Sequence, residues 1–279
     1  MIPLTDDQQV FLAKLKAKID SNELVLPTLP EVAIKVRDAA AKENTTAVQL
    51  AEIIATDAAL SARLLQVANS PLYRARMEID NIVVAITRMG NTVIRGLITS
   101  IVMKQMYQST SKTLDSHFRD IWQHSVNIAA MSRALACLQP ELDPEQAMLA
   151  GLIHQIGKLP ILTLAEESPE LVNNEKLLDE YLEVLHPHVG KIIMDSWTFP
   201  DSLSVVPWQY SQYDRESNGA ADYVDIVTVA HAESLANTDS FINLANIPAF
   251  TRLGLQPEVE IMEIEGIAEE AEQVQNMML

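Results

Sequence analysis

The sequence predicts an all-α protein, and three observations support that fold class. Glycine is scarce, at 8 of 279 residues, which is roughly 3% against a usual share of about 7%. Sheets with tight turns consume glycine, whereas helices need it mainly at their ends. Helix-capping patterns recur along the chain, and apolar residues fall on single helical faces without a sustained strand alternation.

The first 107 residues contain several helix starts. Thr5 with Gln8, and Thr46 with Gln49, each resemble a capping box, in which the hydroxyl and the glutamine side chain bond backbone N–H groups at the helix start. Further starts are predicted at Pro30, Asp57, Asn81 and Asn91. Gly90 is expected to end the helix that begins at Asn81. These residues therefore predict a compact helical lobe.

Helix signals continue through the second half of the chain. A long helix over about 115–138 is expected to carry His124, and Asp143 is expected to cap a helix with His154 in its last turn. A helix ending near Leu185 is then expected, followed by a new helix that Pro187 opens. A buried helix over 220–236 carries His231.

Charge and composition exclude several classes of protein. With 20 basic and 38 acidic residues the net charge is −18, which disfavours nucleic acid and anionic lipid as partners. The single cysteine, Cys137, excludes an internal disulfide and fits a reducing compartment. No signal peptide is visible, and the longest apolar run, 96–103, is too short to span a bilayer. We expect a cytoplasmic protein that does not enter a membrane.

Seven short motifs occur in a fixed order and resemble one known family. They are Leu26-Pro-Thr-Leu-Pro-Glu-Val32, the stretch 54–71, Ala85-Ile-Thr-Arg-Met-Gly90, Trp122-Gln-His-Ser125, Gly151-Leu-Ile-His-Gln-Ile-Gly-Lys-Leu159, His188-Val-Gly190 and Trp197-Thr-Phe-Pro200. Together they resemble the HDOD family, a signalling relative of the HD metal-dependent phosphohydrolases. The resemblance implies a two-lobed helical fold: an N-terminal lobe over 1–110, an HD-like lobe over 111–240, and an acidic helical extension over 241–279.

The resemblance also implies a degenerate metal site. The ligand set of HD hydrolases is a histidine, a His-Asp pair and a later aspartate; here these positions resemble His124, His154-Gln155 and His231. A carboxylate is a charged, hard ligand that can bridge two cations, whereas the amide oxygen of Gln155 is neutral and binds metals weakly. Two carboxylates are therefore absent from the expected set.

The histidines leave two interpretations open. Three imidazoles can hold a divalent transition metal such as Zn, Ni, Mn or Fe, so a metal at His124, His154 and His231 is one hypothesis, although no cofactor is expected. The other hypothesis is that they are core histidines bonded to each other, to Gln155 or to backbone. His188 is an outside candidate with an expected place on the surface or at a helix start. His117 and His186 have no motif support and are expected to be solvated.

The N-terminal lobe is locally basic within this acidic chain. Positions 61–104 contain six basic residues and two acidic ones, Glu78 and Asp80, which gives this stretch a net charge of +4. The candidate partner-binding residues are Arg63, Arg74, Arg76, Arg88 and Arg95. They predict either a face for an acidic partner or phosphorylated ligand, or arginines that only cover helix surfaces.

The acidic extension has its own predicted packing face. Residues 258–272 include seven glutamates and no lysine or arginine, which is typical of a solvated helix face. The residues expected to dock this extension are Val259, Met262, Ile264, Ile267 and Ala271.

These patterns favour a bacterial, non-catalytic HDOD-type signal-transduction module that binds a protein partner or a small regulator. The alternative from a different class is a metal-dependent phosphohydrolase acting on a nucleotide or phosphodiester. A nucleic-acid adaptor is a third hypothesis, which requires the local basic face to outweigh the global charge.

Overall fold

The chain is all-helical, as predicted. The computed structural model describes residues 3–42, 44–73, 78–107, 114–197, 199–217, 219–236, 242–257 and 259–279, and no strand occurs among them. The longer helices are α1 (Asp6–Asp20), α2 (Glu31–Ala40), α3 (Ala47–Ile54), α4 (Ala58–Ala68), α5 (Ile82–Met89), α6 (Asn91–Met106), α7 (Asp115–Ala136), α8 (Pro144–Ile153), α9 (Lys158–Ala165), α11 (Glu175–Trp197), α14 (Tyr223–Ala236) and α16 (Ile267–Met278). The short ones are α10 (Pro169–Val172), α12 (Asp201–Ser204), α13 (Val206–Gln209), α15 (Pro248–Arg252), η1 (Pro71–Tyr73), η2 (Leu244–Asn246) and η3 (Ile261–Glu263).

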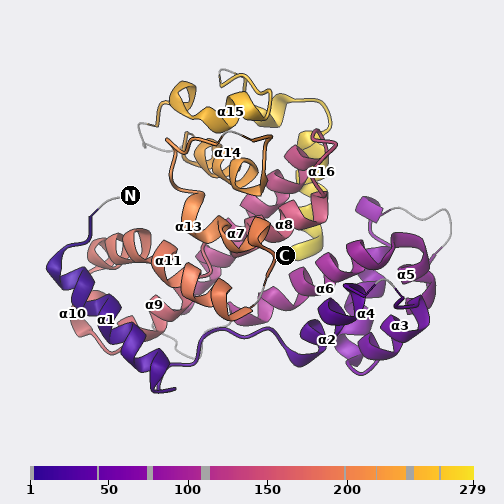
Figure 1. Cartoon of the computed structure of the whole chain (residues 1–279), viewed down its shortest axis with the longest axis horizontal. Coiled ribbons are helices and arrows are strands. Elements are labelled where there is room, and N and C mark those ends of the chain that lie inside the picture. The colour runs from indigo at the N-terminus through magenta and orange to yellow at the C-terminus, as the bar shows by residue number, and fades with distance from the viewer. Residues whose placement is uncertain are drawn as a thin grey trace.

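Helices α7 and α8 form the centre of the molecule (Figure 1). On one side of them lie α2–α6, on another lie α9–α11 with α1, and α13–α15 cover them from above in this view. One continuous cluster of buried apolar side chains joins nearly all of these helices. The core therefore runs through all three groups of helices.

Local capping determines where several helices begin, as the sequence predicted. The Thr5 hydroxyl accepts from Gln8 N at 3.3 Å, and Gln8 Oε1 accepts from Thr5 N at 3.0 Å. The same reciprocal pair forms between Thr46 and Gln49, while Asp143 caps α8 through the N–H groups of its second and third residues. Each bond satisfies an N–H group that has no partner inside its own helix.

The prediction that Pro187 opens a new helix is wrong. Helix α11 runs without interruption from Glu175 to Trp197, with Pro187 inside it. Proline removes one backbone donor and crowds the preceding turn. The carbonyl that loses this donor is that of Glu183, four residues earlier, and at the preceding residue the His186 imidazole Nδ1 donates to the Leu182 carbonyl at 2.8 Å. Because Leu182, Leu185, His186 and Val189 are also buried along this face, packing outweighs the local preference of proline.

Helix α1 packs on the second half of the chain. Gln8 Nε2 donates to Glu180 Oε1 at 3.0 Å, and the Phe11 ring meets Tyr181 edge-on at 5.3 Å between centroids. Its main neighbours are α9 and α11, well apart from α2–α6 (Figure 1). The division at residue 110 stays a prediction, but α1 does not pack with the lobe in which the sequence placed it.

The acidic extension docks along α7 through α16. Ile267 and Ala271 are buried as expected, together with Val274 and Met277. Val259 and Met262 are instead 39% and 38% exposed, so the first part of the predicted stripe is only half-covered.

Among the described residues, the helical stretch Pro144–Ala165 has the length and composition that would suit a membrane span, but 94% of its apolar 18-residue window is buried inside the protein. It comprises α8, a turn and α9, which are central to the core.

Candidate functional site

Three helices bring the predicted histidines together. His124 lies on α7, His154 is the C-cap of α8, and His231 lies on α14. The ring centroids are 5.4 Å apart for His124 and His154, 5.7 Å for His124 and His231, and 5.9 Å for His154 and His231. We call these three residues the histidine cluster.

Close packing of α7 on α8 places two of these rings side by side. Gly151 lies one turn before His154, and a Cβ at Gly151 would lie 2.4 Å from Ala129 Cα. No side chain fits in that space, since real Cβ contacts are far longer. The glycine therefore allows the two helix backbones to approach, and the approach sets the distance between His124 and His154.

The ring nitrogens of His154 have distinct roles. Nδ1 lies 2.5 Å from the Gly151 carbonyl oxygen, which can only accept, so Nδ1 carries the proton. Nε2 is buried and has no partner among the described residues; the same is true of His124 Nε2. Two imidazole nitrogens at the cluster thus lack a described hydrogen-bond partner.

Burial keeps the cluster neutral. It lowers the pKa of His154 well below its usual value, and the neighbouring imidazoles lower it further. Burial, followed by the charge of Lys158, lowers the pKa of His124 to about 4. Burial and then His124 lower the pKa of His231 to about 3. A charged imidazole in this environment loses hydration, and the attraction of the Glu183 carboxylate for His124 and His231 does not offset that loss, so all three rings are uncharged near neutral pH.

The structure adds Tyr210 and His186, which the sequence analysis did not place at the site. The Tyr210 ring lies 4.8 Å from His154 and 5.0 Å from His231 between centroids. Because His186 Nδ1 donates to the Leu182 carbonyl, its Nε2 accepts from the Tyr210 hydroxyl at 2.6 Å. The hydroxyl in turn accepts from Gln155 Nε2 at 3.4 Å.

The expectation that His186 is solvated is therefore wrong, since it is only 1% exposed. It shares a helical face with the apolar Leu182, Leu185 and Val189, and that spacing was the available signal for its burial. His117 is half-buried near the site, and His188 is half-buried in the middle of α11 against Trp208 at 4.9 Å, not at a helix start.

A cavity of about 360 Å³ opens onto the cluster between α7, α11 and α14. Gln155, His124 and His231 line it, and Lys158 and Glu183 form an ion pair at its edge. Burial raises the pKa of the Glu183 carboxyl, but the Lys158 ammonium outweighs this and brings the pKa down to about 2. This carboxylate, one of four acidic side chains that line the cavity, is thus already paired with a cation.

The residues present do not fit a dinuclear metal centre. No group of three His, Cys, Asp or Glu side chains among the described residues is placed to hold a metal ion. The Tyr213 hydroxyl lies 2.7 Å from His231 Nδ1, and the Gln155 amide is turned to Tyr210. The two unpartnered imidazole nitrogens would suit one cation, but neutral ligands do not balance the charge of two.

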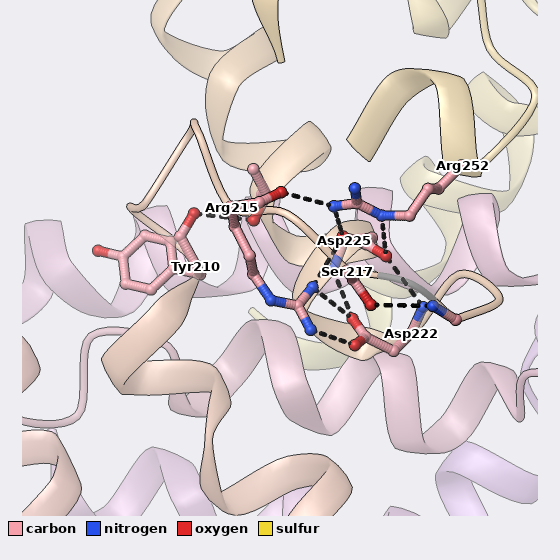
Figure 2. A network of polar contacts seen from close by, with 8 residues as sticks. Tyr210, Arg215, Ser217, Asp222, Asp225 and Arg252 are labelled. Carbon is pink, nitrogen blue, oxygen red and sulfur yellow. Dashed lines mark hydrogen bonds and ion pairs between the residues drawn. The ribbon is translucent and has the colours of Figure 1, made fainter. Parts of the chain in front are cut away.

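A buried ion network fastens the segment that follows Tyr210. Figure 2 shows the Asp225 carboxylate between the guanidinium groups of Arg215 and Arg252. Arg215 Nη1 is 2.9 Å and Arg252 Nη2 is 2.6 Å from Asp225 Oδ1, and Asp225 is 1% exposed. Arg215 also pairs with Asp222. The network ties Arg215, together with Arg252 of α15, to Asp225 of α14, and so holds the neighbouring Tyr213 beside His231.

The three predicted partner-binding arginines that the structure describes lie in different surroundings. Arg63 Nη2 donates to the Met277 carbonyl of α16 at 2.5 Å, so the chain's own C-terminal helix occupies it. Arg88 is exposed, and Arg95 lines a separate cavity. Arg74 and Arg76 lie outside the described residues.

The fold and the cluster together define a helical protein of the HD type, in which three helices bring histidines into one buried site. A model of the HDOD domain family matches residues 26–212. The chain belongs to the HDOD domain family.

Solved structures share this fold. A "putative metal-dependent phosphohydrolase" from Shewanella amazonensis SB2B is 28% identical, with a TM-score of 0.84, 99% of this chain covered and 100% of that one. An HDOD domain protein of unknown function from Geobacter sulfurreducens is 18% identical, with a TM-score of 0.71, 97% of this chain covered and 99% of that one. A "putative signal transduction protein" from Marinobacter aquaeolei VT8 is 19% identical, with a TM-score of 0.62, 97% of this chain covered and 65% of that one.

An uncharacterized protein of Treponema pallidum (strain Nichols) is 22% identical over 217 residues. That match covers 73% of this chain and 41% of the relative, so the chain spans less than half of that protein's length.

Proposed function

We propose that the chain is a non-catalytic HDOD regulatory module, which acts in bacterial cytoplasmic signal transduction by binding a partner. The observation that carries the proposal is the composition of the histidine cluster and of the two side chains bonded beside it: three neutral imidazoles, the Tyr210 hydroxyl and the Gln155 amide, with no carboxylate among these five groups. A metal-activated hydroxide requires a cation whose charge the ligands balance. The signal-transduction relative named above has the same fold.

A metal-dependent phosphohydrolase is the second candidate, and two observations favour it. The Nε2 atoms of His124 and His154 are buried without a described partner. The Shewanella amazonensis protein that shares the fold at a TM-score of 0.84 is described as a phosphohydrolase.

Metal analysis and an activity screen separate the two candidates. The purified protein is analysed for metals before and after incubation with Mn, Ni or Fe(II), and then tested on nucleotide monoesters and phosphodiesters. We expect less than stoichiometric metal and no turnover. Stoichiometric metal together with turnover that His154→Ala abolishes, and that the control His188→Ala retains, would establish the phosphohydrolase instead.

A further inference from the structure

A second cavity, of about 440 Å³, lies away from the histidine cluster, where α2, α6, α8 and the segment 199–203 meet. Its apolar wall comes from Leu149, Phe199 and Leu203, with Ala41 at the rim. Facing that wall, Thr92, Arg95 and Thr99 lie on successive turns of α6. The volume is within the range of about 300–1,000 Å³ that small-molecule sites occupy. The cavity is thus large enough for a ligand and has two chemically different sides.

The close approach of α6 and α8 fixes the floor of this cavity. A Cβ at Gly96 would lie 3.0 Å from Glu145 Cβ, so the glycine allows the two helices to pack tightly there. The Thr99 hydroxyl is already bonded to the Arg95 carbonyl at 2.9 Å. The polar side of the cavity is therefore built on a rigid helix pair.

The two arginines of the cavity differ in what they bind. Arg37 is held in place, because its Nη1 donates to the Trp197 carbonyl at 2.6 Å and its Nε donates to Asp38 at 3.0 Å. The Arg95 side chain is half-buried and makes no ion pair or hydrogen bond with a described residue. In a chain of net charge −18, a partly buried cation without a carboxylate partner favours an anion from outside.

We propose that this cavity binds a small organic anion, with its phosphate or carboxylate on the Arg95 guanidinium and a flat apolar body against Phe199 and Leu149. A guanidinium presents paired N–H donors that match both anionic groups, and arginine keeps its charge at all relevant pH values. The apolar wall supplies burial for a ring system. The site lies outside the histidine cluster and goes beyond the proposed function, so the tests of the two can fail independently.

Calorimetric titration with naphthyl phosphate and naphthoate tests the proposal, with neutral naphthol and inorganic phosphate as matched probes that lack one half of the ligand. We expect the better of the two aromatic anions to bind with a Kd below about 1 mM, and naphthol and inorganic phosphate to bind at least about tenfold more weakly. The preferred anion identifies the headgroup. If neither aromatic anion binds with a Kd below about 1 mM, or if naphthol binds as tightly as the better anion, the proposal is wrong.

Three variants locate the binding. Arg95→Gln removes the charge, and Ala41→Phe fills the rim while both arginines stay in place. Each should weaken binding at least about tenfold. The control Arg119→Gln removes a side chain on α7 that is 70% exposed, pairs with Asp115 and does not line the cavity, and it should leave the Kd unchanged. Equal affinity of Arg95→Gln and Ala41→Phe with the parent would place the anion elsewhere and overturn the proposal.

Discussion

Gln155 follows His154, where the HD hydrolases have an aspartate, and its amide is bonded to the Tyr210 hydroxyl. This contact gives the glutamine a role in the closed cluster that a carboxylate could not take, because a carboxylate only accepts hydrogen bonds. We therefore expect this position to govern both the polarity around the cluster and its affinity for metals.

Restoring carboxylates should rebuild a site for hard cations. We expect the double variant Gln155→Asp with His231→Asp to bind Mn or Fe(II) at least tenfold, or about 1.4 kcal/mol, more tightly than the parent. The metal-free double variant should be less stable, since two buried carboxylates repel each other and lose hydration. Calorimetry measures both quantities. Gln123→Asp adds one negative charge on the exposed side of α7, against two in the double variant, and serves as the control for added surface charge. Equal metal binding by all three proteins would contradict the assignment of position 231.

The Tyr210 hydroxyl bonds two buried side chains, those of His186 and Gln155, and we expect it to contribute to the free energy of unfolding. Tyr210→Phe leaves His186 Nε2 without its donor and Gln155 without its acceptor, while the ring packing is kept. We expect a loss of about 1–3 kcal/mol in the free energy of unfolding, which is the range for an unsatisfied buried polar group. Denaturant titration is the measurement. Tyr181→Phe, at a half-exposed ring on α11, should change stability by less than about 0.5 kcal/mol. A similar loss in both variants would mean that the Tyr210 hydroxyl has no special role.

The packing of helix pairs sets the geometry around which these side chains are arranged. Helices α7 and α8 touch backbone to backbone at Gly151, and the turn before α9 touches α11 at Gly157. At both places the nearest atoms to an added Cβ are backbone atoms, which cannot move aside independently of the helix. The spacing of the histidine cluster is therefore a property of the helix pair.

Gly151→Ala tests that dependence. The added methyl would lie 2.4 Å from Ala129 Cα, so α8 must shift away from α7. We expect the free energy of unfolding to fall by about 1–3 kcal/mol, the usual cost of overpacking. Gly219→Ala is the matched control, because an added Cβ there meets only the Ser217 side chain at 3.9 Å. Unchanged stability of Gly151→Ala would show that the two helices separate without cost.

The acid response of the whole chain follows from its buried neutral histidines. In the folded protein burial, followed by the Lys158 charge, lowers the pKa of both His124 and His186 to about 4. The unfolded chain takes up protons near the ordinary histidine value of about 6.5. As the pH falls below about 6.5, the histidines of the unfolded chain therefore bind protons while those of the folded protein stay neutral. The free energy of unfolding decreases as a result, until the folded-state histidines are protonated at about pH 4.

This predicts a slope of roughly 1.4 kcal/mol per pH unit for each such histidine. Measuring the free energy of unfolding between about pH 6.5 and 5 avoids most carboxyl titration. His186→Gln removes one such histidine, so it should lower the slope of unfolding free energy against pH by roughly 1.4 kcal/mol per pH unit relative to the parent. A parent whose stability is flat over this interval would show that the histidines are not buried as neutral groups.

Local sequence determined the fold class and where many helices begin. The caps at Thr5, Thr46 and Asp143 each bond an N–H two or three residues ahead, so neighbouring residues suffice to predict them. The resemblance placed His124, His154 and His231 at corresponding positions, and the tertiary structure brings their rings together.

Contacts between distant segments decided the rest. Pro187 lies inside a helix because His186 and the apolar Leu185 and Val189 on the same face are buried by other elements, and no local preference contains that information. Tyr210 reaches the cluster through α13, Arg63 is occupied by a carbonyl 214 positions away, and Arg95 lines a cavity built by four separate segments. The sequence by itself thus determined the helices and the order of the histidines along the chain. Only the tertiary structure decided which polar groups are buried, paired or left facing a cavity, because desolvation depends on neighbours that are remote in sequence.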